Sequence, residues 1–214
     1  MSISPQDVER IVFRSLRTAY EKDRGSWTAP PNIIYVTEVT GCLRRSWYIR
    51  TMAGPLSDEK IVILLLGDDV HYLINSQFPL GEGEKSFERE YRDVTVKGRV
   101  DRIAGDYIFE FKTASSIPRE PRDHHVDQMQ LYFWLTDKNK GFLVYVSKTT
   151  GQVKAFQIQR DDERIKGLLQ RVVLLSDSLK QAVPPEPEKG WLCDYCEFKE
   201  YCPVFREAVQ NPPS

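Results

Sequence analysis

The sequence predicts an α/β fold, in which helices flank a central mixed β-sheet and a cysteine-rich segment forms a C-terminal cap. Short runs rich in β-branched and aromatic residues, typical of strands, lie at 107–114, 141–148 and 152–159. Longer stretches with apolar residues at helical spacing lie on both sides of these runs, at 5–22 and 161–182. Three of the four cysteines fall within one ten-residue stretch near the end: Cys193, Cys196 and Cys202.

Composition indicates a globular protein of one domain, or one domain with a small appendage. Its 214 residues are 41% hydrophobic and 29% charged, and the net charge is −1. A charge so near zero excludes a globally basic nucleic-acid binder, so any DNA-binding surface has to be a local patch. The longest apolar run, 61–66, is far shorter than the roughly 20 residues that span a bilayer. No secretory signal is recognisable, so we expect a cytoplasmic protein with no membrane association, in which thiols stay reduced.

The pattern divides the chain into three parts: 1–56, 57–182 and 183–214. In the first part, apolar spacing predicts a helix from Pro5 to Lys22, and glycine with paired prolines predicts a loop over 25–32. A β-branched run then leads to Cys42. The third part begins with a proline-rich linker, 183–190, which precedes the clustered cysteines.

The middle part holds the predicted sheet. Ser57 is a suitable N-cap for a helix that ends at about Phe78, because Asp58 and Glu59 suit the positive start of a helix. A turn or loop is expected at 81–85. The remaining predicted elements are strands at 91–101 and 107–114 joined by a hairpin connection at 102–106, a helix at 123–136, strands at 141–148 and 152–159, and a helix at 161–182.

The predicted strand 107–114 carries the candidate active site. Side chains alternate between the two faces of a strand, so Glu110 and Lys112 project to the same face. Asp101 ends the preceding predicted strand and can reach the same place across the hairpin connection. Two carboxylates supply the hard oxygen ligands that suit Mg²⁺ or Mn²⁺, and such a metal neutralises charge on a phosphate and lowers the pKa of a bound water. A lysine beside them orients that water or stabilises developing negative charge.

An exposed Glu–Lys pair on an ordinary strand is the simpler alternative, because surface ion pairs are common. However, the aromatic and aliphatic neighbours of Glu110 and Lys112 favour a buried strand. Charged groups in such a strand need a partner or an ion, which favours the functional interpretation.

Two predicted helices carry further polar residues. His71 lies one turn after Gly67 on the same helix face, and Gln128 and Tyr132 share a face of the helix 123–136. Taken singly, these residues fit a partly buried histidine and an ordinary amphipathic helix. His124 and His125, with nearby aspartates, favour a helix start with one histidine in reach of a phosphate over a second metal site.

Four short motifs occur in order: G-x-x-x-H at 67–71, G-R-V-D at 98–101, E-F-K at 110–112 and Q-x-x-x-Y at 128–132. Together they resemble the RecB-like branch of the PD-(D/E)XK nucleases, which implies the nuclease core of that branch. The resemblance implies that a divalent metal, Mg²⁺ or Mn²⁺, is held by His71, Asp101, Glu110 and the backbone carbonyl of Phe111. It also implies Lys112 as the catalytic lysine, with Gln128 and Tyr132 positioning the DNA strand or the catalytic groups.

The four cysteines admit more than one metal centre. The C-x₂-C-x₅-C spacing of Cys193, Cys196 and Cys202, with the remote Cys42, gives four thiolates, and a reducing compartment disfavours disulfides. Zinc is an alternative, although zinc sites usually combine two local pairs. The one-plus-three division, with Pro203 directly after the last cysteine, favours an iron–sulfur cluster.

The resemblance extends to these cysteines. RecB-like nucleases with an iron–sulfur cluster place one cysteine before the nuclease core and three after it, as this chain does. The chain is therefore most similar to the CRISPR-associated RecB-like iron–sulfur nucleases of the spacer-acquisition module. The resemblance implies a cluster, [4Fe–4S] in preference to [2Fe–2S], that holds the two ends of the chain together over the DNA path.

The residues directly after Cys42 combine basic and aromatic character: Arg44, Arg45, Trp47 and Tyr48. Such side chains suit single-stranded nucleic acid, through phosphate pairing and base stacking. An amphipathic helix with an exposed basic face and a buried aromatic face explains the same residues equally well.

We therefore expect a metal-dependent DNA exonuclease that prefers single strands. The resemblance implies 5′→3′ polarity, a role in trimming DNA before its integration into a CRISPR array, and the integrase proteins of that system as partners. The alternatives are a stand-alone RecB-like repair exonuclease and a non-catalytic, cluster-stabilised DNA-binding subunit, against which intact Asp101, Glu110 and Lys112 argue. Whether the protein forms a homo-oligomer is left open by the sequence.

Overall fold

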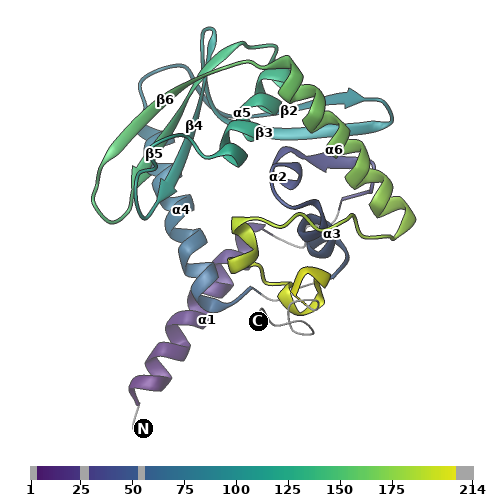
Figure 1. Ribbon diagram of the computed structural model, residues 1–214. Helices are drawn as coiled ribbons and strands as arrows, with labels where there is room; N and C mark the ends of the chain where they lie inside the picture. The colour runs from purple at the N-terminus through teal and green to yellow at the C-terminus, as the bar shows by residue number, and fades with distance from the viewer. Residues whose placement is uncertain (1–3, 25–28, 53–55, 206–214) are drawn as a thin grey trace, which may run out of the picture.

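The computed structural model describes residues 4–24, 29–52 and 56–205, and it confirms an α/β fold with a central mixed sheet (Figure 1). The first part of the expected loop over 25–32, residues 25–28, and the end of the predicted cap, 206–214, lie outside the described residues. The described elements in chain order are α1 (Pro5–Arg24), β1 (Ile33–Tyr35), α2 (Val36–Val39), α3 (Leu43–Thr51), α4 (Asp58–Gln77), β2 (Glu82–Tyr91), β3 (Val94–Ala104), β4 (Tyr107–Ala114), α5 (Asp123–Thr136), β5 (Lys140–Ser147), β6 (Val153–Gln159), α6 (Asp162–Gln181), and two short 3₁₀ helices, η1 (Trp191–Tyr195) and η2 (Lys199–Tyr201).

The long strand β3 organises the sheet. β2 pairs with it in antiparallel fashion along one edge. The other edge is shared, because β1 pairs in parallel with residues 95–97 of β3 and β4 pairs antiparallel with residues 102–104. Between these two pairings, residues 98–101 of β3 have no ladder partner on this edge within the described part of the chain. β5 continues the sheet in parallel with β4, and β6 pairs antiparallel with β5.

The helices α2, α5 and α6 cover one face of the sheet and enclose the main hydrophobic core. α5 is the most deeply placed of them, since every side chain from Gln128 to Leu135 is buried. Phe78, directly after α4, packs against Phe109 and Phe111, with ring centroids 5.3 and 5.4 Å apart. These two phenylalanines alternate with Glu110 along β4, so α4 approaches the face opposite the core.

The first helix and the described part of the C-terminal segment lie away from the sheet. α1 packs along α4 and extends outward, and residues 183–205 return beside α3 (Figure 1). No helix in the described part of the chain combines the length and the apolar character that crossing a membrane requires.

The structure corrects the predicted hairpins. The expected turn at 81–85 is mostly strand, because β2 begins at Glu82, and the prediction missed the real turn at Arg92 and Asp93. β3 runs on to Ala104, so the connection to β4 is only Gly105 and Asp106 rather than 102–106. Gly105 has a φ of 57°, which glycine adopts without the steric cost that other residues bear. Asp101 therefore lies inside β3 and does not end it.

The helix predictions are confirmed more closely. α5 spans the predicted residues, and the Ser57 side chain caps α4 by accepting a hydrogen bond from the Lys60 N–H at 3.2 Å. The local signal at Ser57 thus placed the start of α4 well.

Candidate active site

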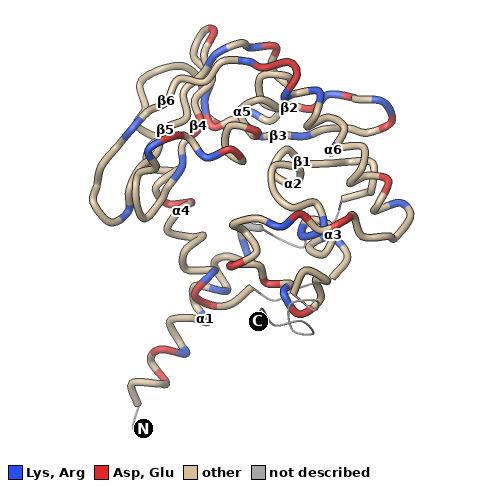
Figure 2. The backbone as a smooth tube through the Cα atoms, in the orientation of Figure 1, with Lys and Arg blue, Asp and Glu red and all other residues tan. Residues whose placement is uncertain are grey.

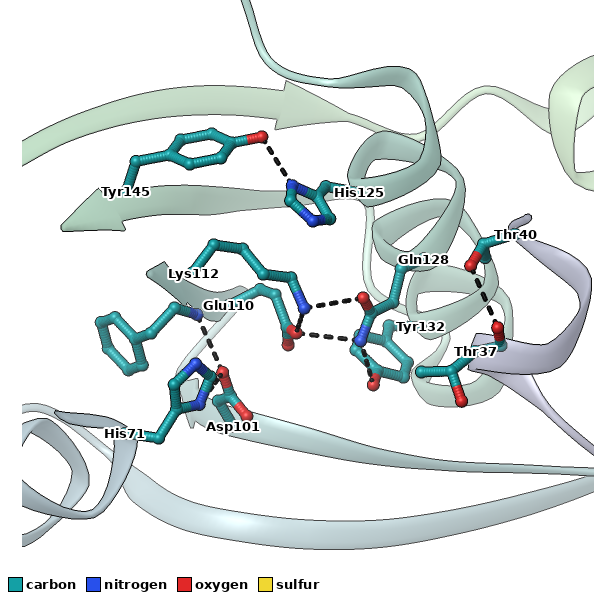
Figure 3. A network of polar contacts seen from close by, with 11 residues as sticks. Thr37, Thr40, His71, Asp101, Glu110, Lys112, His125, Gln128, Tyr132 and Tyr145 are labelled. Carbon is teal, nitrogen blue, oxygen red and sulfur yellow. Dashed lines mark hydrogen bonds and ion pairs between the residues drawn. The ribbon is translucent and has the colours of Figure 1, made fainter. Parts of the chain in front are cut away.

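Asp101 and Glu110 lie together where β3 and β4 separate (Figure 3). The pairing of these strands reaches as far as Arg102 opposite Phe109 and then stops. Beyond that point, Asp101 Oδ2 accepts a hydrogen bond from the Phe111 N–H at 2.8 Å. The carboxylate takes the place of a backbone acceptor, and this contact fixes it beside Glu110.

Lys112 joins Glu110 to helix α5. Its Nζ donates to Glu110 Oε1 at 2.6 Å and to Gln128 Oε1 at 2.8 Å. Gln128 Nε2 in turn donates to Glu110 Oε1 at 2.9 Å and to Tyr132 Oη at 2.7 Å. The prediction that Glu110 and Lys112 share a face is confirmed, and the structure brings Gln128 and Tyr132 into the same network.

Burial dominates the electrostatics of Glu110. The residue is 2% exposed, and its Oε2 has no hydrogen-bond partner within the described part of the chain. Burial raises the pKa of Glu110 to about 7, the Asp101 charge adds to this, and the Lys112 ammonium opposes it. A buried carboxylate oxygen without a partner is costly unless a cation or a proton occupies it.

His71 reaches this site from α4. Its Nδ1 is 3.5 Å from Asp101 Oδ2. Burial favours the neutral imidazole, but the hydrogen bond and the charge of Asp101 outweigh it and raise the pKa of His71. Burial alone would raise the pKa of Asp101. The contacts with His71 and with the Phe111 N–H outweigh burial and leave this pKa below its usual value.

Two glycines of the motifs allow close packing around the site. A Cβ on Gly98 would lie 2.9 Å from side-chain carbons of Val36, Tyr132 and Leu135, so only glycine lets α5 approach β3 here without displacement. A Cβ on Gly67 would lie 3.4 Å from Thr113 Oγ1, which is a tight contact. Gly98 therefore sets the depth at which the Tyr132 ring lies.

The sequence interpretation missed one residue beside the site, Tyr145. In the parallel register of β4 and β5, Tyr145 stands opposite Lys112. Its Oη lies 2.8 Å from His125 Nδ1. Alternation along β5, which buries Leu143, Tyr145 and Ser147, was the available signal, but the pairing partner of β5 could not be inferred from it.

The four cysteines surround one pocket. Cys42, at the start of α3, and Cys193, Cys196 and Cys202 all line this pocket, which is partly open to solvent. All four are free thiols, and burial raises the pKa of Cys196. Among residues 4–24, 29–52 and 56–205, however, no three His, Cys, Asp or Glu side chains are gathered closely enough to hold a metal ion. The thiols thus share a pocket without the close spacing of an assembled metal centre.

Comparison with known proteins identifies the fold family. Residues 58–203 match the family model of the PD-(D/E)XK nuclease superfamily. The chain belongs to this superfamily.

Three relatives are similar to this PD-(D/E)XK protein over most of its length. It is 29% identical over 190 residues to a protein of Saccharolobus solfataricus named CRISPR-associated exonuclease Cas4. The matched region covers 81% of this chain and 88% of that protein. The crystal structure of SSO0001 matches with a TM-score of 0.71 and 26% identity, covering 90% of this chain and 96% of that one. The alkaline exonuclease LHK-Exo of Laribacter hongkongensis shares the fold, with a TM-score of 0.50, 14% identity, and coverage of 90% and 98%.

The chemistry of the donor set suits a divalent cation, although among the described residues His71, Asp101 and Glu110 do not lie as close together as the ligands of a bound metal ion do. Glu110 offers an oxygen that has no partner among the described residues, and the charges of Asp101 and His71 act on this carboxylate. Carboxylate oxygens are the ligands that Mg²⁺ and Mn²⁺ prefer, and a cation would relieve the burial of the Glu110 charge. The carbonyl of Phe111 as a further ligand stays a prediction.

The residues predicted to bind DNA have partners within the protein. Arg44 Nε donates to the Pro185 carbonyl at 2.6 Å, and Arg45 forms two hydrogen bonds, of 3.0 and 2.7 Å, with the Glu197 carboxylate. Trp47 Nε1 donates to the carbonyl of Ser178 at 3.2 Å, and the buried Tyr48 hydroxyl donates to the carbonyl of Tyr201 at 3.0 Å. These contacts favour the structural alternative, in which α3 holds the end of α6 and the C-terminal segment, so their DNA-binding role stays an untested prediction.

Proposed function

We propose that the protein is a divalent-metal-dependent exonuclease that degrades single-stranded DNA with 5′→3′ polarity and trims DNA for CRISPR spacer acquisition. The observation that carries this proposal is the buried network of Glu110, Lys112 and Gln128 beside Asp101, in which one Glu110 oxygen has no partner in the described part of the chain and could accept a cation. Similarity to a protein named CRISPR-associated exonuclease supports the exonuclease activity and the CRISPR role.

The residues of the network have separate tasks in this proposal. Asp101, Glu110 and His71 would hold Mg²⁺ or Mn²⁺, which when bound neutralises phosphate charge and lowers the pKa of a coordinated water. Lys112 Nζ has three N–H groups, and two of them are engaged by Glu110 and Gln128. The third remains for the attacking water or for a phosphate oxygen, where a positive charge stabilises the developing negative charge.

Gln128 and Tyr132 position this lysine. Gln128 uses its carbonyl oxygen toward Lys112 and its amide N–H groups toward Glu110 and Tyr132, so the amide orientation is fixed by three partners. Because both residues lie on the buried α5, the network is attached to a rigid element of the fold.

The proposal includes an iron–sulfur cluster on Cys42, Cys193, Cys196 and Cys202, with [4Fe–4S] favoured over [2Fe–2S]. Support comes from the shared pocket of the four thiols and from the donor set, which suits iron and other thiophilic metals. The cluster would fasten the C-terminal segment to α3. The proposed partners are single-stranded DNA and the integrase proteins of the same CRISPR system, and the proposed location is the cytoplasm. The oligomeric state should be measured for the protein alone and in the presence of these partners.

Degradation of end-labelled DNA tests the activity. With Mn²⁺ or Mg²⁺, we expect loss of a 5′ label from linear single strands, no cleavage of circular single strands, and no activity in EDTA. Glu110→Gln should abolish the reaction, whereas Glu163→Gln, which alters an exposed residue, should leave it unchanged. Wild-type rates in Glu110→Gln would refute the active-site assignment, and release of a 3′ label first would refute the polarity.

Metal analysis after anaerobic purification tests the cluster. We expect iron and acid-labile sulfide in the ratio of a [4Fe–4S] cluster, with a brown colour. A colourless protein that contains one zinc per chain would contradict the iron–sulfur cluster and indicate a zinc site instead. Co-purification with the integrase proteins encoded in the same genome would support the CRISPR role, and a gene located away from any CRISPR array would favour a stand-alone repair exonuclease.

A further inference from the structure

His125 lies beside the active site and has no task in the function proposed above. It precedes Gln128 by about one turn of α5, and its Nδ1 lies 2.8 Å from the hydroxyl of Tyr145. Because Tyr145 stands opposite Lys112 in the sheet, the imidazole lies between the Tyr145 hydroxyl and the Lys112 ammonium (Figure 3).

The hydrogen bonds of Tyr145 determine which nitrogen of His125 carries the proton. Tyr145 is 0% exposed, and its Oη accepts a hydrogen bond from the Arg122 N–H at 3.0 Å. The buried hydroxyl proton needs an acceptor of its own, and Nδ1 of His125 is the acceptor within reach. Tyr145 therefore donates to Nδ1, which leaves the imidazole proton on Nε2.

The surroundings keep this imidazole neutral. Burial, together with the positive charge of Lys112 and contributions from His124 and Arg122, lowers the pKa of His125 to about 2. A second cation next to the Lys112 ammonium would repel it, whereas a neutral N–H donor does not. The result is one fixed tautomer with a donor and no net charge.

The donor is aimed at the site. Nε2 of His125 has no hydrogen-bond partner within the described part of the chain, and in Figure 3 it lies on the side of the ring that faces Lys112. A non-bridging oxygen of a phosphodiester accepts N–H donors of this kind. We propose that His125 donates its Nε2–H to a non-bridging oxygen of the DNA phosphodiester that Lys112 approaches, which makes it a substrate-binding residue of this active site; this inference rests on the proposed nuclease function.

Two substitutions of His125 separate the donor from the shape of the ring. His125→Phe fills the same space without a donor, and we expect kcat/KM for single-stranded DNA to fall about 10-fold to 100-fold, as loss of a hydrogen bond to a charged group does. In His125→Gln the amide nitrogen can occupy the place of Nε2, so most activity should return. Glu163→Gln, at an exposed residue of α6, is the control and should match the wild type.

A spectroscopic measurement tests the tautomer without using activity. Nitrogen-15 NMR of the histidine side chains should show Nε2–H and an unprotonated Nδ1 for His125 in the wild type. Tyr145→Phe should convert this signal to a mixture of both tautomers. Adding a single-stranded oligonucleotide to Glu110→Gln protein, which we expect to bind DNA without cleaving it, should shift the Nε2–H resonance.

The outcomes distinguish the inference from the function on which it rests. An Nδ1–H tautomer, an Nε2–H resonance that does not respond to bound DNA, or a folded His125→Phe variant as active as the wild type would overturn the role of His125 and leave the nuclease function standing. A wild-type protein that degrades no DNA with either metal would overturn the function itself. Thermal unfolding of each variant shows whether it is folded. If His125→Phe does not fold, the activity of His125→Gln and the NMR signal of the wild type test the role of His125.

Discussion

The Phe111 N–H donates to Asp101 Oδ2 at 2.8 Å, at a place where β3 and β4 no longer pair. In a continuous hairpin this N–H would donate to a carbonyl of β3. The carboxylate instead spans the gap between the separating strands, and the same oxygen lies 3.5 Å from His71 Nδ1. One atom therefore connects β3, β4 and α4, and it stands next to Glu110.

This contact makes different predictions for two substitutions of Asp101. Asp101→Asn keeps an acceptor for the Phe111 N–H, whereas Asp101→Ala leaves that buried group without one, which costs about 1–3 kcal/mol. Both variants should lose nuclease activity, because both remove the carboxylate charge that a cation requires. Urea unfolding measures the difference in stability, and equal stability of the two variants would contradict the structural role of this hydrogen bond.

The burial of Glu110 predicts how stability depends on pH when no divalent metal is bound. Its pKa in the folded protein, about 7, lies above the ordinary value of 4.5, so the folded state binds more protons between these values. The contribution of this group to stability should therefore be fully present below about pH 4.5 and be lost as pH rises through about 7, by roughly 3 kcal/mol in total. Urea unfolding in EDTA across pH 5–8 measures this change.

Glu110→Gln is the control for that measurement, because an amide does not titrate. The difference in unfolding free energy between the wild type and this variant should change with pH over the same interval. Saturating Mn²⁺ should restore the stability of the wild type at pH 8 and should have little effect on the variant. A difference that is independent of pH would mean that the carboxyl group titrates normally.

The sequence predicted those parts of the site that depend on local pattern. Alternation along one strand placed Glu110 and Lys112 on the same face, and helical spacing placed Gln128 and Tyr132 together. What it missed depends on pairing between distant segments. β2 is held by its pairing with β3 rather than by burial, so most of its residues are exposed and it lacks an apolar alternation. For this reason the sequence predicts a turn at 81–85 instead of a strand.

The segment after Cys42 is a second case in which long-range contacts could not be predicted from local sequence. Arg45 and Tyr48 looked suitable for DNA because their partners, Glu197 and Tyr201, follow them by about 150 residues. Tyr145 escaped notice for a related reason, because its relation to Lys112 follows from the parallel pairing of β4 with β5. Local patterns do not contain such long-range pairings.

Gly98→Ala should destabilise the protein and disturb the active site together. The added methyl would lie 2.9 Å from side-chain carbons of Tyr132, Leu135 and Val36, and overpacking of this kind costs about 1–3 kcal/mol. Displacement of Tyr132 would also weaken its hydrogen bond with Gln128, so we expect activity to fall several-fold in the fraction that remains folded. Urea unfolding and kcat measured well below the transition temperature separate the two effects.

Gly167→Ala is the matched control for Gly98→Ala. Gly167 lies in α6, and a Cβ there would meet nothing within 4 Å. Alanine in an exposed helix position stabilises by about 0.5–1 kcal/mol relative to glycine, so the two substitutions should change stability with opposite signs. A stabilising effect of both substitutions would indicate that backbone entropy, and not crowding near Tyr132, determines the effect at Gly98.

Cys42→Ser tests whether the proposed cluster fastens the C-terminal segment. Without the metal centre, this segment keeps exposed contacts such as Arg45 with Glu197, and pairs of this kind contribute little on their own. We therefore expect loss of iron and faster proteolysis within the linker 183–190, detected by mass spectrometry of the fragments. Because the Trp191 ring lies 4.8 Å from that of His124, release of the segment also frees the start of α5, and nuclease activity should fall with it. Tyr195→Ala, at a side chain that is 72% exposed, should change neither iron content nor proteolysis, and a Cys42→Ser variant with wild-type iron content would remove Cys42 from the ligand set.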